Sequence, residues 1–186
     1  VVSAMVEGPN LGATDGAVGP VPRVSLLIPC YNEEESVDEL MTEVMQVIQR
    51  HNLDAEGVLV DDGSRDKTWD KLAVWADKEP RVKLVRFRRN FGQTAAMVAG
   101  MDHSTGEVII PLDADLQNDP NSIPDLMAKV EEGYDVVSGW RKNRIDNAVT
   151  RKIPSRIANW LMKKASGVEL HDFGTTFKAY RAEVLK

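Results

Sequence analysis

Pro111-Leu-Asp-Ala-Asp-Leu-Gln-Asn-Asp-Pro120 is the most informative stretch of this 186-residue chain. It overlaps a short apolar run, residues 108–112, of the kind that a buried central strand needs. Asp113 and Asp115 follow that run, and residues two apart in an extended chain point to the same side, so both carboxylates face one place. Together with the amide oxygen of Gln117 they form a set of hard oxygen ligands suited to Mg²⁺ or Mn²⁺, especially where substrate phosphates complete the shell. The alternative is a polar turn with solvated aspartates, and this stretch alone does not separate the two.

The length and composition favour one globular domain. With 42% hydrophobic residues, the chain can bury one sizeable core. Residues 1–22 are rich in glycine, proline and alanine and show no hydrophobic periodicity. We expect residues 1–22 to be a disordered tail or an expression remnant and residues 23–186 to be the folded domain.

The charge is unevenly distributed along the chain. The formal net charge of −6 argues against a general nucleic-acid binder. Residues 141–164, called the basic island below, hold eight lysines and arginines against one acid, so the remainder of the chain is strongly acidic. Such an island indicates an anionic substrate or a membrane surface, although a solvated helix face is an equally ordinary reason for it.

Cysteine and hydropathy exclude several classes of protein. Cys30 is the single cysteine, which rules out an internal disulfide or a cysteine-based zinc site and fits a reducing compartment. No apolar run reaches membrane-spanning length, and the N-terminus lacks the pattern of a signal peptide. As given, the chain is expected to be neither secreted nor integral to a membrane.

Strand and helix patterns alternate from residue 24 onward. The predicted strands cover residues 24–28, 58–60, 82–87, 108–112, 135–138 and 176–180. The predicted helices cover residues 34–50, 67–77, 93–104, 122–132 and 151–166. This alternation predicts an α/β fold with a mainly parallel sheet between helices. Ligands of such sheets bind beyond the carboxyl ends of the strands, and here several strands end in acidic residues.

Four loop motifs at these strand ends carry a family resemblance. They are Pro29-Cys-Tyr-Asn-Glu33, Asp61-Asp-Gly-Ser64, Asn90-Phe-Gly92 and Asp113-Ala-Asp-Leu-Gln117. Together they resemble the family-two glycosyltransferases, which have a GT-A-type nucleotide-diphospho-sugar transferase fold. Within that family the chain is most similar to the polyprenyl-phosphate glycosyltransferases, the group of dolichol-phosphate mannose synthase and the bactoprenol glucosyltransferases. The resemblance covers residues 23–186, and the sequence has neither the dinucleotide-binding glycine fingerprint nor a phosphate-loop motif.

The resemblance implies a donor site for a nucleotide sugar linked to UDP or GDP. Tyr31 offers a flat face for a base, and Asn32, Glu33 and Asp62 offer hydrogen-bonding groups for base or ribose edges. Plain turn chemistry is the alternative for Tyr31 and Asn32. The other donor-site residues implied are Pro29, Asn90, Gly92 and Asp113. Family members often carry a lysine after the Asn-x-Gly turn, where this chain has Gln93.

The same resemblance implies a metal site and the catalytic residues. Asp115 and Gln117 match the direct ligands of Mg²⁺ or Mn²⁺, and Asp113 contacts the nucleotide, or the metal through water. Asp113 and Asp115 are therefore the expected catalytic residues. The ion would bridge the diphosphate and stabilise its charge as it leaves the anomeric carbon.

The basic island contains the expected acceptor site. Gly139-Trp-Arg141 and Arg151-Lys-Ile-Pro-Ser155 resemble the part of the subgroup that holds the acceptor phosphate, which implies Arg141, Arg151 and Ser155 as phosphate ligands. A phosphate monoester is already ionised near neutral pH, so no strong general base is required. His171 and Asp172 are the alternative base candidates.

These observations predict a metal-dependent, inverting transfer of a sugar from a nucleotide diphosphate to a polyprenyl phosphate. The reaction would take place at the cytoplasmic face of a membrane, with no nucleic acid involved and with homo-oligomer formation left open. A transferase acting on a saccharide hydroxyl and a catalytically silent nucleotide-sugar-binding module are the alternatives. Full-length relatives usually continue further, often with transmembrane helices, so we expect the chain to be truncated at its C-terminus.

Overall fold

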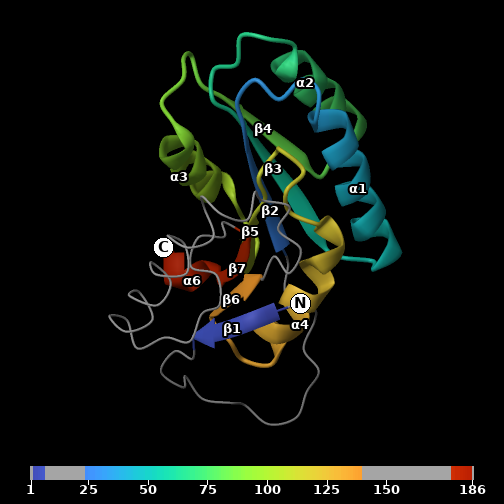
Figure 1. The fold of residues 1–186 in the computed structure, drawn as a ribbon, viewed down its shortest axis with the longest axis vertical. Helices are drawn as coiled ribbons and strands as arrows, with labels where there is room; N and C mark the ends of the chain where they lie inside the picture. The colour runs from blue at the N-terminus through green and yellow to red at the C-terminus, as the bar shows by residue number, and fades with distance from the viewer. Residues whose placement is uncertain (1, 7–23, 140–176, 186) are drawn as a thin grey trace, which may run out of the picture.

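A seven-stranded mixed sheet forms the centre of the protein (Figure 1). The structure is a computed structural model and describes residues 2–6, 24–139 and 177–185. The strand order is β1-β6-β7-β5-β2-β3-β4. The strands are β1 (Val2–Val6), β2 (Val24–Cys30), β3 (Ala55–Asp61), β4 (Val82–Arg86), β5 (Val108–Pro111), β6 (Val136–Gly139) and β7 (Lys178–Arg181).

Four neighbouring strands, β5, β2, β3 and β4, form the parallel half of the sheet. In this half Cys30 is paired with Asp61, and Asp61 with Arg86. Parallel strands in this register bring their carboxyl ends to one edge. The loops that follow β2, β3, β4 and β5 therefore emerge side by side, as the sequence predicted.

The other half of the sheet is antiparallel, which the sequence pattern did not predict. Strand β7 is antiparallel to both β5 and β6, between which it lies, and β1 is antiparallel to β6. Strand β7 comes last in the chain but occupies a central position in the sheet. Its direction depends on pairing between residues that are far apart in the sequence, and local periodicity contains no information about that pairing.

Helices cover both faces of the sheet (Figure 1). They are α1 (Val37–Arg50), α2 (Thr68–Lys78), α3 (Gln93–His103), the 3₁₀ turn η1 (Pro120–Ser122), α4 (Ile123–Glu131) and α6 (Ala182–Leu185). In Figure 1, α1, α2 and α4 lie on one side of the sheet and α3 on the other. The main core fills the first side, where alternate residues of β2 (Leu26, Ile28) meet Leu40 of α1 and Leu126 of α4.

Helix α3 packs very closely on the opposite face. A Cβ atom on Gly100 would lie 2.7 Å from Leu27 Cγ and 3.3 Å from Val60 Cγ2, so only glycine fits at this point. Small residues, among them Ala95, Ala96 and Ala99, recur along this helix and permit the close approach.

Two predicted boundaries differ from the structure. Val2–Val6, inside the segment expected to be a disordered tail, form strand β1 at the edge of the sheet. Five residues are too few to show a strand period against the surrounding glycines and prolines. Helix α1 begins at Val37, not near residue 34, and the loop before it is held by hydrogen bonds from the backbone N–H groups of Glu33 and Glu34 to the side chains of Thr68 and Asp66.

A buried polar cluster lies at the amino-terminal edge of the parallel strands. The carboxylate of Glu56 accepts from Ser25 Oγ at 2.7 Å and from the Thr105 N–H at 2.7 Å, and it pairs with Lys83 Nζ at 2.8 Å. Burial alone would raise the pKa of Glu56, but the hydrogen bonds from Lys83, Ser25 and Thr105 outweigh it and hold the pKa at about 2. The cluster joins β2, β3, β4 and the loop before β5 on the side away from the loop motifs.

Within the described parts of the chain, no helix is both long enough and apolar enough to cross a bilayer.

Candidate active site

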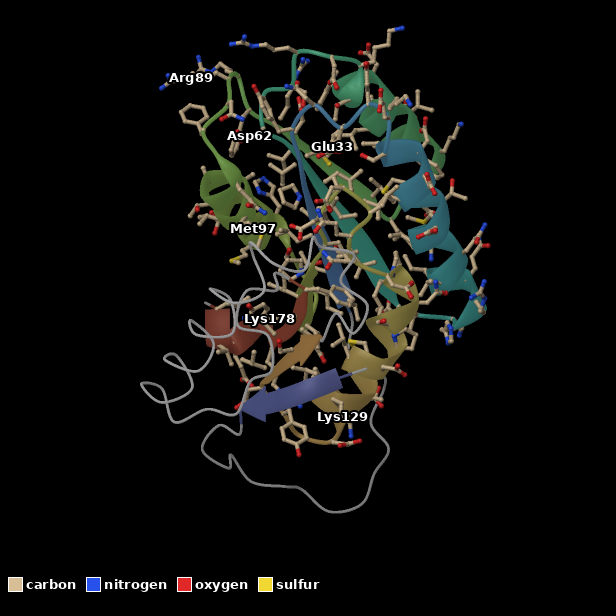
Figure 2. The ribbon with its side chains drawn as sticks, viewed as in Figure 1. Glu33, Asp62, Arg89, Met97, Lys129 and Lys178 are labelled. Carbon is tan, nitrogen blue, oxygen red and sulfur yellow. The ribbon has the colours of Figure 1, made fainter. Side chains whose placement is uncertain are left out.

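The four loop motifs surround a cleft at the carboxyl edge of the parallel strands. The side chains of Glu33 and Asp62 lie at this end of the sheet, and Lys129 of α4 lies at the opposite end of the molecule (Figure 2). The cleft has a volume of about 530 Å³, within the usual size range of small-molecule sites. It is lined by Pro29, Cys30, Tyr31, Glu33, Asp62, Asn90, Gly92, Gln93, Ala96, Asp113, Ala114, Asp115 and Gln117.

Most residues that the sequence assigned to donor and metal line this cleft, and Asn32 is the exception. Asn32 has a left-handed backbone with φ of 55°, its N–H donates to Ser64 Oγ, and its Oδ1 accepts the Arg65 N–H at 2.9 Å. Asn32 therefore ties the loop after β2 to the loop after β3. The sequence interpretation of Asn32 as turn chemistry describes this arrangement better than contact with a base.

Asp62 holds the loop between β4 and α3. Its side chain is buried, with 3% of the residue exposed, and its two carboxylate oxygens accept the N–H groups of Phe91 (2.7 Å) and Gly92 (2.9 Å). Gly63 lies against the same loop, because a Cβ on it would lie 2.6 Å from Arg89 Cα, and its φ is +68°. The Asp-Asp-Gly-Ser motif thus fixes the position of the Asn90-Phe91-Gly92 turn at the cleft.

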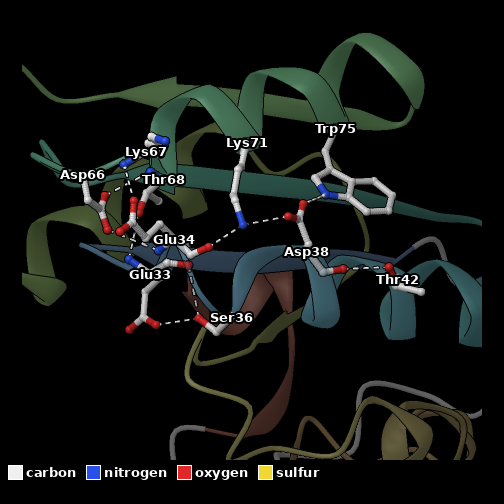
Figure 3. A network of polar contacts seen from close by, with 10 residues as sticks. All are labelled: Glu33, Glu34, Ser36, Asp38, Thr42, Asp66, Lys67, Thr68, Lys71 and Trp75. Atoms are coloured by element: carbon white, nitrogen blue, oxygen red, sulfur yellow. Dashed lines mark hydrogen bonds and ion pairs between the residues drawn. The ribbon is translucent and has the colours of Figure 1, made fainter.

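The loop before α1 is joined to the start of α2 by a polar network (Figure 3). The Glu33 N–H donates to Thr68 Oγ1 at 2.7 Å, and the Lys67 N–H donates to Glu34 Oε2 at 2.9 Å. Lys71 reaches the carbonyl of Glu34 and forms an ion pair with Asp38 at 2.8 Å. These contacts hold the loop that contains Tyr31 and Glu33 in one position beside the cleft, and Tyr31 remains 40% exposed.

Asp113 is held by two side-chain amides from different loops. Gln93, the first residue of α3, donates Nε2 to Asp113 Oδ1 at 3.3 Å, and Asn118 donates Nδ2 to Asp113 Oδ2 at 3.1 Å. Gln93 occupies the position where family members often have a lysine, and here its amide is directed toward a carboxylate of the cleft. Each carboxylate oxygen of Asp113 thus accepts a hydrogen bond from one of these amides.

Asp115 and Gln117 point into the cleft from a strained turn. Leu116 between them has a left-handed φ of 60°, which is costly for a residue with a branched side chain, and its side chain packs against the main core. Asp115 accepts the Gln117 N–H at 3.2 Å and Gln117 Nε2 at 2.7 Å. The turn therefore places the two expected metal ligands in direct contact.

The cleft is acidic. Glu33, Asp62, Asp113 and Asp115 line it, and no lysine, arginine or histidine is among its lining residues in the described part of the chain. Cys30 is buried, and burial raises the pKa of its thiol, so Cys30 stays a neutral thiol and is not a nucleophile. No group of three or more His, Cys, Asp or Glu within the described residues is arranged to hold a metal unaided.

Sequence comparison identifies the protein family to which the chain belongs. The sequence model of glycosyl transferase family 2 matches residues 25–186. The chain belongs to glycosyl transferase family 2. The match includes all four loop motifs, which confirms the predicted resemblance and accounts for their arrangement around one cleft.

Two similar proteins carry the name of a polyprenyl phosphate. The chain is 44% identical over 165 residues to the dodecaprenyl-phosphate galacturonate synthase of Rhizobium johnstonii. It is also 44% identical over 164 residues to the undecaprenyl-phosphate 4-deoxy-4-formamido-L-arabinose transferase of Shewanella sediminis. Each alignment covers 88% of the chain and 49% of the relative, so the chain spans about half the length of these proteins.

Solved structures of glycosyltransferases share the fold. Glucosyl-3-phosphoglycerate synthase from Mycobacterium tuberculosis, in complex with Mn²⁺, UDP and phosphoglyceric acid, has a TM-score of 0.69 at 16% identity, covering 88% of this chain and 57% of that one. TarS from S. aureus, in complex with UDP-GlcNAc, has a TM-score of 0.61 at 20% identity, covering 88% and 46%. These likenesses confirm the predicted GT-A-type fold.

Some predicted site residues of this family 2 chain fall outside the described residues. They are the acceptor-phosphate residues Arg141, Arg151 and Ser155, the alternative bases His171 and Asp172, and the helix expected over 151–166. Conversely, the sequence analysis assigned no role to Asn118, although it belongs to the stretch quoted first. Only its position after the Asp-x-Asp-x-Gln motif could have suggested one.

Proposed function

We propose that this chain is the donor-binding part of a metal-dependent, inverting glycosyltransferase that moves a sugar from a nucleotide diphosphate to a polyprenyl phosphate. The observation on which the proposal rests is the acidic cleft at the carboxyl edge of β2, β3 and β5. Its walls combine carboxylates, an amide and an exposed aromatic ring, and its volume is adequate for a nucleotide sugar.

The charge of the cleft favours a divalent cation. A diphosphate placed among four carboxylates, with no cation among the described lining residues, would be repelled, so added positive charge favours its binding. Asp115 and Gln117 supply oxygen ligands of the type that Mg²⁺ and Mn²⁺ prefer, with Asp113 close behind them. When bound, the ion neutralises the diphosphate and acts as a Lewis acid toward the leaving oxygen. The described residues do not by themselves form a metal site, and donor phosphates are the further oxygen ligands that a bound nucleotide sugar would supply.

The residues of the cleft bind and orient the donor. Tyr31 presents a partly exposed ring on which a base can stack, and Glu33, beside it, offers a carboxylate to base or ribose. Asp62 acts indirectly, by holding the turn that brings Asn90 and Gly92 to the cleft. Holding the donor in one orientation lowers the entropy cost of bringing its anomeric carbon to the acceptor phosphate.

The chemical step is a single displacement. An oxygen of the acceptor phosphate forms a bond to the anomeric carbon while the bond from that carbon to the diphosphate breaks, and the nucleoside diphosphate leaves with the electron pair. One displacement inverts the anomeric configuration. The acceptor phosphate is already ionised near pH 7, so no proton has to be removed.

The acceptor is assigned from the relatives and from the sequence. Two proteins at 44% identity are named for dodecaprenyl and undecaprenyl phosphate. Arg141, Arg151 and Ser155 are proposed to bind the acceptor phosphate, since arginine forks match phosphate oxygens. A lipid acceptor would place the reaction at a membrane surface, on the cytoplasmic face where nucleotide sugars are made. UDP or GDP, and Mn²⁺ or Mg²⁺, remain alternatives, with UDP and Mn²⁺ present in the complex of the mycobacterial synthase.

A nucleotide-release assay tests the proposal. The chain is incubated with Mn²⁺ and a panel of UDP- and GDP-linked sugars, and free nucleoside diphosphate is measured with undecaprenyl phosphate, with an oligosaccharide or with no acceptor. We expect metal-dependent release that only undecaprenyl phosphate stimulates, and Arg151→Ala should lower it without changing donor affinity. Release stimulated only by the oligosaccharide would contradict the lipid acceptor, and donor binding without release under any condition would indicate a binding module.

A further inference from the structure

We propose that Asn118 is a positioning residue of the donor site, which fixes the orientation of the Asp113 carboxylate for the cation and the nucleotide. The inference rests on the proposed function, because it assumes that Asp113 takes part in binding a metal–nucleotide complex. The inference goes beyond the proposed function because it assigns a role to a buried residue that does not line the cleft.

The contacts fix the orientation of the Asn118 amide. Asn118 Nδ2 lies 3.1 Å from Asp113 Oδ2, and Gln93 Nε2 lies 3.3 Å from Asp113 Oδ1. An ionised carboxylate only accepts hydrogen bonds, so the amide nitrogen of Asn118 must face Asp113 and the amide oxygen must face away. Asn118 is 3% exposed and Gln93 is exposed, so Asn118 is the more rigid of the two holders.

The amide oxygen of Asn118 is expected to lower the stability of the fold. Among the described residues, Asn118 Oδ1 is a buried oxygen without a hydrogen-bond partner. A buried acceptor without a partner lowers stability, and leucine has the same number and connectivity of side-chain heavy atoms without the polar groups. Stability alone would therefore not favour asparagine at this position. In the described part of the chain, the one side-chain hydrogen bond of Asn118 is the bond to Asp113, which indicates that the residue serves the site.

The backbone of the loop explains how Asn118 reaches that place. Exposure alternates along the loop, with Asp115 and Gln117 exposed and Asn118 buried. The left-handed Leu116 turns the chain between them. The loop thus directs Asp115 and Gln117 into the cleft while Asn118 supports Asp113 from behind, an arrangement typical of groups that orient metal ligands from outside the ligand shell.

The test compares stability with metal binding in Asn118→Leu. Binding of Mn²⁺ to the 1–186 chain is followed by the loss of the free Mn²⁺ electron paramagnetic resonance signal, with whichever of UDP and GDP binds the wild type. Thermal unfolding is measured on the same samples without ligand. Asn121→Leu is the matched control, because Asn121 is exposed and contacts Asp119 and Arg50 outside the cleft.

We expect Asn118→Leu to unfold at or above the wild-type temperature and to bind Mn²⁺ roughly 10- to 100-fold more weakly, the usual effect of removing a partner of a metal ligand. Asn121→Leu should bind like the wild type. Unchanged Mn²⁺ affinity in Asn118→Leu would overturn this inference alone. Asn118→Leu could instead lose both stability and Mn²⁺ affinity, with the affinity not restored on cooling well below its unfolding temperature. That result would show a structural role for Asn118 and would also overturn the inference. Failure of the wild type to bind Mn²⁺ with either nucleotide would overturn the proposed function itself.

Discussion

Asp115 is the exposed carboxylate of the cleft, whereas Asp113 and Glu33 are partly buried and Asp62 is buried. Its described hydrogen bonds come from Gln117, two residues away, so its side chain contributes little to the fold. We expect Asp115→Ala to lower the affinity for a nucleotide with Mn²⁺ at least a hundredfold, about 2.8 kcal/mol, and to leave the unfolding temperature within a degree or two. Calorimetric titration measures the first and a thermal melt the second. Equal affinity in the variant would rule out Asp115 as a ligand.

Asp62 presents the opposite case, because its carboxylate is used inside the protein. Replacement by alanine leaves the N–H groups of Phe91 and Gly92 without their acceptor. We expect Asp62→Ala to lower the free energy of unfolding by about 1–3 kcal/mol and to weaken nucleotide binding with or without metal. Urea denaturation gives the first value, and hydrogen exchange at Phe91 and Gly92 should become faster. Asp102→Ala, at an exposed position of α3, is the control. Unchanged exchange at both amides would show that Asp62 does not hold the turn.

At the scale of elements, the close approach of α3 to the sheet positions Gln93 and the Asn90-Phe91-Gly92 turn. The absence of a side chain at Gly100 permits this approach, because an added methyl group would displace the side chain of Leu27, which is fully buried. We expect Gly100→Ala to destabilise the protein by about 1–3 kcal/mol and to weaken nucleotide binding by displacing the first turn of α3. Gly57→Ala is the control, because its new Cβ would lie an ordinary 3.5 Å from Val82. A Gly100 variant as stable as the Gly57 variant would contradict the close packing.

Elements defined by local patterns were predictable from the sequence, and elements defined by distant contacts were not. The strands that end at Cys30, Asp61 and Pro111 were recognised from apolar runs followed by acids, and these strand ends bring the cleft together. The loop before α1 is held by Thr68 and Asp66, more than thirty residues away. Likewise, no local sequence pattern shows that the Asp62 carboxylate accepts hydrogen bonds from the backbone N–H groups of Phe91 and Gly92, in the loop after β4. The sequence therefore identified which residues meet at the cleft better than it identified what each one contacts.

At the scale of the whole molecule, stability and binding reside at opposite edges of the sheet. The Glu56 cluster joins β2, β3, β4 and the loop before β5 at the amino edge, and the cleft lies at the carboxyl edge. The two can therefore be changed separately, and a variant at Glu56 should affect folding without affecting nucleotide affinity.

Because of the Glu56 carboxyl group, we expect the free energy of unfolding to fall at acid pH. Its pKa is about 2 in the folded protein against an ordinary 4.5, so the unfolded chain takes up the proton more readily. The stabilisation is fully present above about pH 4.5 and is lost as the pH falls toward 2, with a total on the order of 3 kcal/mol. Denaturant unfolding at several pH values should show a shallower decline for Glu56→Gln than for the wild type. Glu132→Gln, at a surface pair with Lys129, should follow the wild-type curve within about 0.5 kcal/mol. Parallel curves for wild type and Glu56→Gln would contradict the assigned pKa.

The most direct test of the donor site is the cation dependence of nucleotide binding by the 1–186 chain. Calorimetric titrations of UDP and of GDP are carried out with Mn²⁺, with Mg²⁺ and with excess chelator at one ionic strength. Because the cleft is lined by four carboxylates and by no described cation, we predict binding of at least one nucleotide with a divalent ion and affinity at least tenfold weaker with chelator. Equal affinity with and without the divalent ion would contradict the account.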